Sequence, residues 1–167
     1  MIVQNALQCR AFVLCYGSMT PLESFTNDAT EIGRENLAIY VYAGDVDIKD
    51  GNQTINCAHN QLTNLQSLVK GVVEYKAGAN GVSWICINNH PRNLSFDFQL
   101  INSGTTTTVM GSEKEKYIVC LDKQIECNQK TITVNSYAKV KNGVEVSVVV
   151  PEGSVGLLMT EKQVEQN

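Results

Sequence analysis

The order of apolar and polar positions predicts short β-strands along nearly the whole chain. Apolar residues either alternate with polar ones or follow one another over about four to eight positions, as they do in strands. Such runs cover residues 11–16, 37–42, 46–48, 71–75, 82–87, 94–101, 116–121, 130–134, 144–150 and 155–159. Turn-forming residues separate them at 50–52, 78–81, 88–91, 103–104 and 142–143. Many short strands with regular turns indicate a β-sandwich or a barrel.

One segment has a helical rather than a strand-like pattern. Within residues 60–69, Leu62, Leu65 and Leu68 recur at a spacing that places them on one face of a helix. We therefore expect a single helical turn there and little helix elsewhere. A short polar tail after Thr160 is expected to fray.

The strand pattern occurs twice in the same order. Residues 40–48 and 119–127 each read as an apolar strand, a tight turn and an alternating strand. Downstream, a Thr-Ile pair follows in each copy, at 54–55 and 131–132, and then a G-x-x-G at 78–81 and 153–156. The sequence therefore predicts two tandem β repeats, with the first over residues 1–90 and the second, which includes the polar tail, over 91–167.

These segments resemble the cupin family of small double-stranded β-helix barrels. In the second copy, residues 119–126 resemble the family's strand–turn–glycine–strand segment, although Lys123 stands where glycine is usual; Gly44 keeps the glycine in the first copy. Residues 148–155, with Pro151 and Gly153, resemble the opening of the second cupin motif, P-x-G-x-x-H. The resemblance implies an all-β fold of two cupin-like jelly-roll or β-sandwich repeats in tandem, a compact bicupin.

The chain departs from the family at the metal site. Typical metal-dependent cupins bind their ion with two histidines and a glutamate of the first motif and a histidine of the second. Gly81 and Gly156 occupy the second-motif histidine positions, and the only histidines, His59 and His90, are not at equivalent places in the two copies. A zinc, iron or manganese site needs three or four converging ligands. We therefore expect a degenerate, metal-less cupin-like protein that needs no cofactor.

Composition narrows the classes of partner and the location. The chain has 17 acidic and 13 basic residues and a net charge of −4, which argues against nucleic-acid binding because that needs a basic face. No apolar run has the roughly 18 residues of a membrane helix, and the start lacks the pattern of a signal peptide. We expect no membrane partner and a cytoplasmic location, or the virion if the protein is viral. The six cysteines form no C-x-x-C pair and are expected to be reduced and mostly buried.

Two groups of residues have some catalytic potential. Cys57 and His59 are two positions apart and would share a face of a strand, but no third group that could orient them is near, so a loop histidine beside a core cysteine is the preferred interpretation. Glu23, Glu31 and Glu35 lie in the first loop, where acid–base work is possible but a solvated loop is preferred. No catalytic residue is assigned, and whether the protein is an enzyme stays open.

Two functions remain. The first and favoured one is a non-catalytic structural subunit or decoration protein that associates with itself or with a larger assembly, such as a virion. Residues 103–110 contain neither lysine nor proline to protect a strand edge, so Thr106 and Thr108 are the predicted interface residues. The alternative is a metal-free cupin that binds a small polar ligand such as a sugar, as a sensor or isomerase. Trp84, Tyr40 and Tyr42 are the predicted ligand-binding residues, although core packing also explains Trp84. A concave, polar-lined cavity would favour this alternative.

Overall fold

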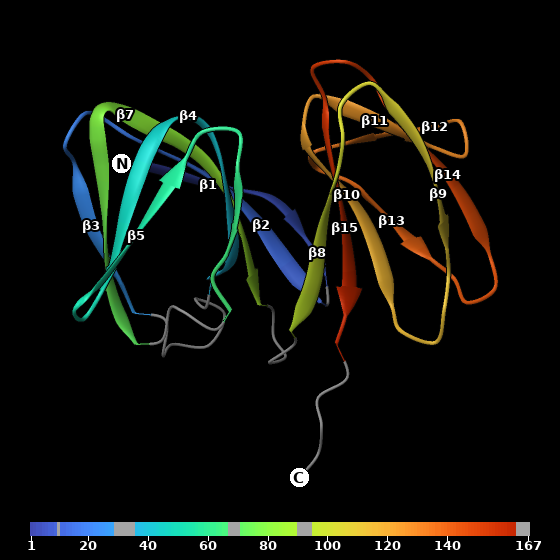
Figure 1. The fold of residues 1–167 in the computed structure, drawn as a ribbon, viewed down its shortest axis with the longest axis horizontal. Coiled ribbons are helices and arrows are strands. Elements are labelled where there is room, and N and C mark those ends of the chain that lie inside the picture. Colours follow the sequence, from blue (N-terminus) through green and yellow to red (C-terminus); the bar gives the residue numbers. More distant parts are fainter. Residues whose placement is uncertain (10, 29–35, 67–70, 90–94, 163–167) are drawn as a thin grey trace, which may run out of the picture. The chain divides into compact units, whose positions relative to one another are not determined.

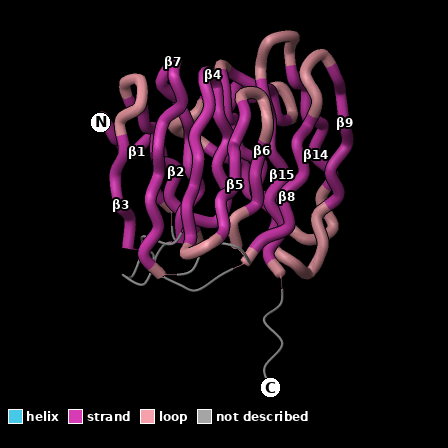
Figure 2. The backbone as a smooth tube through the Cα atoms, turned by 60° about the vertical axis from the view of Figure 1, so that its left-hand side comes forward, coloured by secondary structure: helices cyan, strands magenta, loops and turns pink. Residues whose placement is uncertain are grey.

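The computed structural model describes residues 1–9, 11–28, 36–66, 71–89 and 95–162. Within these ranges all regular secondary structure is β-strand, as the tube of Figure 2 and the ribbon of Figure 1 show. The all-β fold class predicted from the sequence is confirmed. The Cα positions divide the chain into two compact units, Met1–Asn93 and Leu94–Asn167, whereas the sequence pattern placed the division after residue 90.

The first unit is built on two long strands that each pass through both halves of the unit. Its strands are β1 (Ile2–Gln8), β2 (Phe12–Met19), β3 (Ser24–Asp28), β4 (Asn36–Asp50), β5 (Gln53–Ala58), β6 (Leu62–Asn64) and β7 (Val72–Asn89). The ladder runs β1-β2-β7-β4-β5, while β3 also pairs with β7 and β6 with β4. The second half of β7 pairs with β2 and its first half with β3. All of these pairs are antiparallel, and Figure 1 shows β4 and β7 as long bent ribbons.

The second unit contains the same arrangement with its long strands interrupted. Its strands are β8 (Phe96–Ile101), β9 (Thr105–Met110), β10 (Lys116–Asp122), β11 (Gln124–Cys127), β12 (Lys130–Thr133), β13 (Tyr137–Val140), β14 (Glu145–Val150) and β15 (Val155–Glu161). They form two four-stranded sheets, in the orders β13-β10-β15-β8 and β12-β11-β14-β9.

The pairing of strands is equivalent in the two units. In the first, β4 pairs with β5, β6 and β7; in the second, β10 and β11 together pair with the corresponding β12, β13, β14 and β15. Likewise β2 and β3 pair with the two halves of β7, as β8 and β9 pair with β15 and β14. The internal repeat seen in the sequence is therefore a repeat of strand topology, and β1 is an addition to the first unit.

The bend in each copy requires an unusual backbone conformation. Gly44 has φ of +72° and Lys123, at the equivalent position, has φ of +61°. This left-handed region is open to glycine and costly for other residues. In the first unit Gly44 also packs directly on the backbone of Gly81, because a Cβ at Gly44 would lie 2.0 Å from the Gly81 carbonyl oxygen. In the second unit β14 and β15 are separate strands joined at residues 151–154, and Lys123 is tolerated.

Three local expectations were wrong. Leu62–Asn64, expected to be helical, is strand β6 paired with β4, and residues 67–70 of the expected helix lie outside the described residues. The turn expected at 78–81 does not interrupt β7; instead, Gly81 has φ of +76° inside the strand. The turn expected at 88–91 begins inside β7, which ends at Asn89.

Each unit has its own apolar core. In the first unit, side chains from β4 and β7, including Ile39, Val46, Val73 and Trp84, form one buried cluster. In the second, Ile118, Ile125, Val146 and Val148 belong to another. Because side chains alternate in strands, the opposite residues of β4 and β7 lie on the other face.

Candidate ligand-binding site

The first unit contains a cavity of about 390 Å3. It lies between β1, β2 and the second half of β7 on one side and β3 with the first half of β7 on the other. The lining consists of Met1, Val3, Cys15, Phe25, Thr26, Asn27, Asn36, Tyr75, Trp84, Cys86 and Asn88. A volume of a few hundred cubic ångströms is that of a small-molecule site.

Strand alternation explains which side chains reach the cavity. Trp84, Cys86 and Asn88 are spaced two apart on β7, so they share one face of the sheet. Gly17 is the register partner of Trp84 on β2, and the indole lies directly over it: a Cβ at Gly17 would be 2.1 Å from Trp84 Cζ2. The absence of a side chain at Gly17 therefore makes the space that the indole occupies.

Three aromatic rings lie nearly parallel along one wall of the cavity. Phe25 of β3 stacks on its register partner Tyr75, with ring centroids 4.7 Å apart and an interplanar angle of 9°. The ring centroids of Phe25 and Trp84 are 6.2 Å apart, and the angle between the two ring planes is 11°. Phe25 therefore links the two sides of the cavity, and it is the least buried of the three aromatic residues.

Uncharged polar groups supply the remainder of the lining. Asn36 donates a hydrogen bond from Nδ2 to the Tyr75 hydroxyl, and burial raises the pKa of that phenol well above its ordinary value. Asn88 Nδ2 donates to Cys15 Sγ at 3.8 Å. Asn27 brings a further amide from β3, on the same face of the strand as Phe25. Burial also raises the pKa of the Cys15 and Cys86 thiols, so both are neutral at neutral pH.

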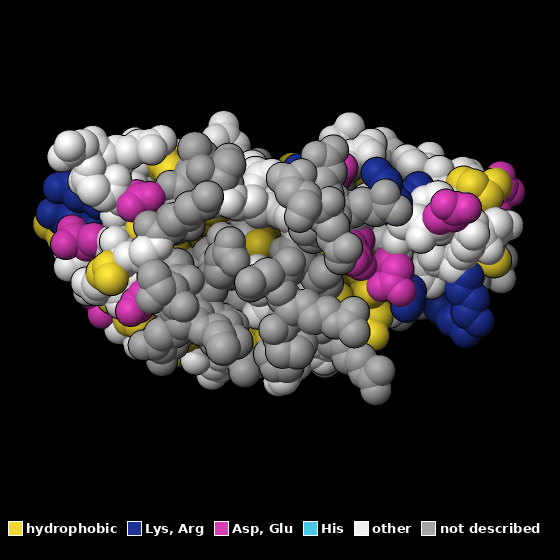
Figure 3. Space-filling model, turned by 90° about the horizontal axis from the view of Figure 1, so that it is seen from below, with side chains coloured by type: hydrophobic (Ala, Val, Ile, Leu, Met, Phe, Trp, Pro, Cys, Tyr) yellow, Lys and Arg dark blue, Asp and Glu magenta, His cyan; other side chains and the backbone are white. Residues whose placement is uncertain are grey.

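The charged side chains lie elsewhere. None of the residues described in the lining is Asp, Glu, Lys, Arg or His, and the amino group of Met1 is paired with Glu23 Oε1 at 2.5 Å. On the face drawn in Figure 3, the charged side chains of the described residues occur with both signs intermixed. Because an unpaired charge is costly to desolvate, a cavity with this lining favours an uncharged ligand.

Of the predicted ligand-binding residues, the structure places Trp84 at the cavity and the two tyrosines on the opposite face. Tyr40 is the register partner of Ile85, one position from Trp84, and so points away from the indole. Tyr40 and Tyr42 pack edge to face at 5.4 Å, and Tyr42 stacks on Tyr16 at 5.9 Å. A role for these tyrosines at another site stays a prediction.

The predicted interface residues lie on a strand at a sheet edge. β9 pairs with β14 and is last in the order of its sheet. Thr106 and Thr108 are exposed there, opposite Val149 and Ser147. The expectation of an extended edge strand at the threonine run therefore agrees with the fold, and the contact that they were predicted to make stays a prediction.

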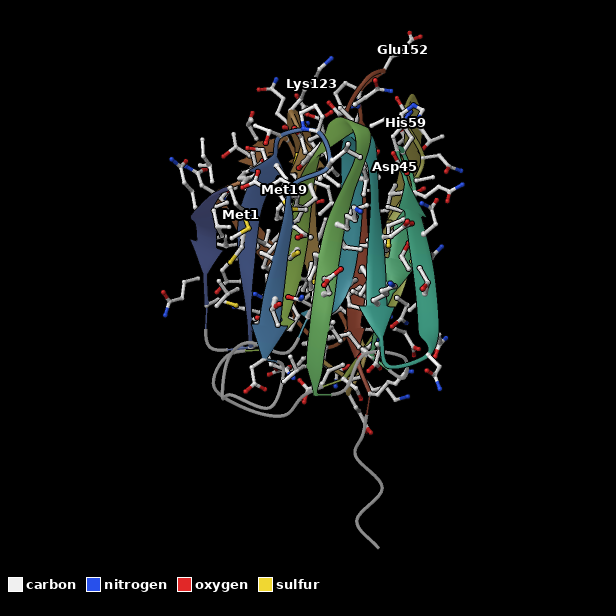
Figure 4. All side chains as sticks on the ribbon, turned by 90° about the vertical axis from the view of Figure 1, so that its left-hand side faces the viewer. Met1, Met19, Asp45, His59, Lys123 and Glu152 are labelled. Atoms are coloured by element: carbon white, nitrogen blue, oxygen red, sulfur yellow. The ribbon has the colours of Figure 1, made fainter. Side chains whose placement is uncertain are left out.

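The other candidate groups do not form a catalytic centre in the described part of the chain. Cys57 is fully buried and burial raises its pKa, whereas His59 is exposed and is drawn at the opposite side of Figure 4 from Met1. Glu23 accepts a hydrogen bond from Thr20 N at 2.9 Å and so stabilises the turn before β3. Glu31, Glu35 and His90 lie outside the described residues.

No metal-binding cluster is found among the described residues, where no group of three or more His, Cys, Asp or Glu side chains converges. Nor does any described segment form a helix long and apolar enough to cross a membrane.

Several lining residues had no signal in the sequence. Phe25 and Asn36 border a segment that reads as a polar loop, and Tyr75 sits in a strand with nothing to distinguish it from core. Asn88 was assigned to a turn between the copies, although it is the last but one residue of β7. The register of β2 and β3 on β7 would have been needed to find them, because it brings residues of these strands to the same cavity as Trp84.

Comparison with known proteins supports the fold alone. No family model matches the sequence, and no curated protein does. Among solved structures, AerE from Microcystis aeruginosa aligns with a TM-score of 0.58 at 11% identity, over 96% of this chain and 93% of that one. The cupin 2 conserved barrel domain protein from Leptotrichia buccalis aligns with a TM-score of 0.51 at 13% identity, over 96% and 88%. A salicylate 1,2-dioxygenase from Pseudaminobacter salicylatoxidans aligns with a TM-score of 0.56 at 9% identity, over 91% and 71%. The chain therefore has a cupin-like fold.

Proposed function

We propose that the first unit is a binding module for a small, uncharged, hydroxyl-bearing molecule, with neutral monosaccharides as the leading class. The observation that carries the proposal is the cavity of about 390 Å3 whose described lining combines stacked aromatic rings with amides and a hydroxyl and contains no charged side chain. This is the second of the two functions expected from the sequence, and the cavity is the feature that was expected to favour it.

The lining suits the two surfaces of a sugar. The C–H face of a pyranose ring is apolar and packs on aromatic rings such as Trp84 and Phe25. Its hydroxyls need hydrogen-bond partners when they leave water, and the amides of Asn27 and Asn88 and the Tyr75 hydroxyl offer both donors and acceptors at the same cavity.

Binding, rather than turnover, is the activity that we propose. General acid–base catalysis needs a group that titrates near the working pH. The titratable side chains in the described lining are the thiols of Cys15 and Cys86 and the phenol of Tyr75, and burial raises the pKa of all three. A sensing or carrier role therefore fits the cavity better than an isomerase role.

Calorimetric titration with matched pairs of sugars tests the proposal. We expect glucose or galactose to bind at least about tenfold more tightly than the corresponding uronic acid, because the lining has no cationic side chain and the Met1 amino group is already paired with Glu23. Replacement Trp84→Phe should weaken binding of the neutral sugar about fivefold, since part of the stacking surface is lost. Replacement Tyr42→Phe, on the opposite face of the sheet, should leave it unchanged. Tighter binding of the uronic acids, or no binding of any neutral sugar, would contradict the proposal.

A second candidate function, self-association, is favoured by the geometry of β9. Gly111 N donates to Val144 O at 2.8 Å at the end of the β9–β14 ladder. Hydrogen-bonded pairs alternate in an antiparallel ladder, so the backbone groups of Thr106 and Thr108 point away from β14. Lys116 Nζ donates to Met110 O at 2.9 Å and so protects one end of this edge, while no such cap is described at the threonines. An edge of this kind can pair with a strand of another copy.

Lysines at the edge should weaken that association. In the double variant Thr106→Lys/Thr108→Lys we expect the dissociation constant of a self-associated form to rise at least about tenfold, because like charges would oppose each other across the new ladder. Replacement Thr131→Lys is the matched control, because Thr131 is an exposed threonine of β12 at the other edge of the same sheet. Light scattering over a concentration series measures the effect. A wild-type monomer at high micromolar concentration that behaves like the double variant would exclude this function.

A further inference from the structure

Two thiols face each other inside the cavity of the first unit. Cys15 on β2 and Cys86 on β7 are direct register partners, and both line the cavity. Partners on one face of an antiparallel pair have Cβ atoms about 4.5–5.5 Å apart. The two sulfurs are therefore neighbours on one wall, two residues along each strand from the Gly17–Trp84 pair.

Each sulfur also has an N–H group directed to it. Asn88 Nδ2 lies 3.8 Å from Cys15 Sγ, and the Trp84 side chain donates to the Cys86 thiol. Donors of this kind orient a sulfur ligand and stabilise negative charge on it, as the surroundings of protein metal sites do. Trp84 and Asn88 belong to β7 and flank Cys86 on the same face, so a rigid strand holds both donors.

Burial keeps these thiols protonated until a metal ion displaces the protons. Cys15 and Cys86 are 9% and 6% exposed, and burial raises the pKa of both. The other titratable groups that interact with Cys86 are Cys57 and, through its phenol, Tyr75, and burial raises their pKa as well. No thiolate is available to charged oxidants at neutral pH, whereas a thiophilic ion can bind by releasing protons.

We propose that Cys15 and Cys86 together bind one Cu(I) ion. Soft thiolate ligands select this ion, and two of them are sufficient for it, whereas zinc requires about four ligands. The described lining offers no His, Asp or Glu to complete a zinc, iron or manganese site. With Cβ atoms about 4.5–5.5 Å apart, the two side chains can turn their sulfurs toward one ion without movement of the backbone.

The binding step balances without a redox change. Two S–H bonds break, two S–Cu bonds form and two protons pass to solvent, while copper stays monovalent. The product carries one net negative charge, toward which the N–H groups of Asn88 and Trp84 are directed. This site does not depend on the proposed sugar-binding function, because it needs only the two thiols and their donors.

Anaerobic titration of the full chain with Cu(I), in competition with bicinchoninate, tests the assignment. The background variant Cys9→Ala removes a thiol that is only partly buried. In it we expect one tightly bound copper per chain, and we expect Cys15→Ala/Cys86→Ala to weaken binding at least about 100-fold, because one ligand or none remains. The matched control is Cys120→Ala/Cys127→Ala in the second unit. Those cysteines are also buried and also interact electrostatically, but they lie on β10 and β11, in different sheets, and are not register partners, so they test whether register pairing is required.

X-ray absorption on the copper-loaded Cys9→Ala variant, which keeps the other five cysteines, gives a second readout. It does not require Cys15→Ala/Cys86→Ala to fold. Two sulfur neighbours around copper support the site. Nitrogen or oxygen neighbours, copper retained by Cys15→Ala/Cys86→Ala, or copper lost from Cys120→Ala/Cys127→Ala would each overturn it. None of these outcomes bears on sugar binding, which is measured without copper.

Discussion

Alanine at Gly44 is expected to lower the free energy of unfolding of the first unit by about 3 kcal/mol, in the range reached when backbone strain and a steric clash combine. Two causes add. The left-handed φ of +72° at Gly44 disfavours any side chain by about 1 kcal/mol. In addition, a Cβ there would lie 2.0 Å from the Gly81 carbonyl oxygen. The β4–β7 ladder holds the backbone at both residues, so neither atom can move away easily. Denaturant unfolding followed by circular dichroism measures the loss.

A second glycine of the same unit separates the two causes. Gly51, in the β4–β5 hairpin, has φ of +58° and would place a Cβ with nothing within 4 Å. Replacement Gly51→Ala should therefore cost only the conformational part, about 1 kcal/mol. In the second unit, Lys123→Gly relieves the left-handed strain but makes the unfolded chain more flexible, so stability should change by less than about 1 kcal/mol. Equal losses for Gly44→Ala and Gly51→Ala would show that the close approach to Gly81 has no energetic role.

Replacement Gly17→Ala is the second change with a large expected effect, and it acts on the cavity. The new Cβ would lie 2.1 Å from Trp84 Cζ2, so the indole must leave its place over β2. Overpacking of this kind costs about 1–3 kcal/mol. If the cavity binds a neutral sugar as proposed, its affinity should also fall at least tenfold, because a wall of the site has moved.

Two further variants make this result specific. Replacement Gly78→Ala also brings a Cβ to 2.0 Å from a side-chain atom, but that atom is a carboxylate oxygen of Asp45, which can turn into solvent. It should leave both stability and binding nearly unchanged. In the double variant Gly17→Ala/Trp84→Phe, the shorter ring relieves the overlap, so the loss of stability should be smaller than the sum of the two single losses. Additive losses would mean that the indole is not what Gly17 accommodates.

Much of the fold could be predicted from the sequence, because it depends on local alternation. The apolar runs that end near Tyr42 and Leu121 are strands, and the repeat that they suggested is a repeat of pairing. The position equivalent to Gly44 was identified as Lys123, and both residues have a left-handed backbone. Such features leave a trace in the sequence because side-chain period and turn conformation restrict which residues fit.

Other elements could not be read because longer-range pairing decides them. Three leucines spaced three apart predict a helical turn, yet Leu62–Asn64 pairs with β4, and those ladder bonds outweigh a weak local preference. Gly78 and Gly81 look like a turn, but they lie inside β7, where Gly81 lets β4 pass close by. A glycine required for close backbone approach has the same letter as one required for a turn.

The candidate site shows the same division. Trp84 was found because it is the only tryptophan of the chain, while Tyr40 was chosen for its residue type and faces the other side of the sheet. Phe25 and Cys15 become part of the site through the register of β3 and β2 on β7. Sequence alone does not fix a register, since a shift of one residue would exchange the two faces.

The single tryptophan also offers the most direct measurement of the central claim that the cavity of the first unit binds a small uncharged ligand. The indole N–H signal of Trp84 can be followed by NMR during titration with the neutral sugar that binds most tightly. We expect a saturable shift of this signal with the dissociation constant found by calorimetry, and no such shift with the matching uronic acid. Calorimetric binding of the neutral sugar that leaves the Trp84 signal unmoved would place the ligand elsewhere and contradict the claim.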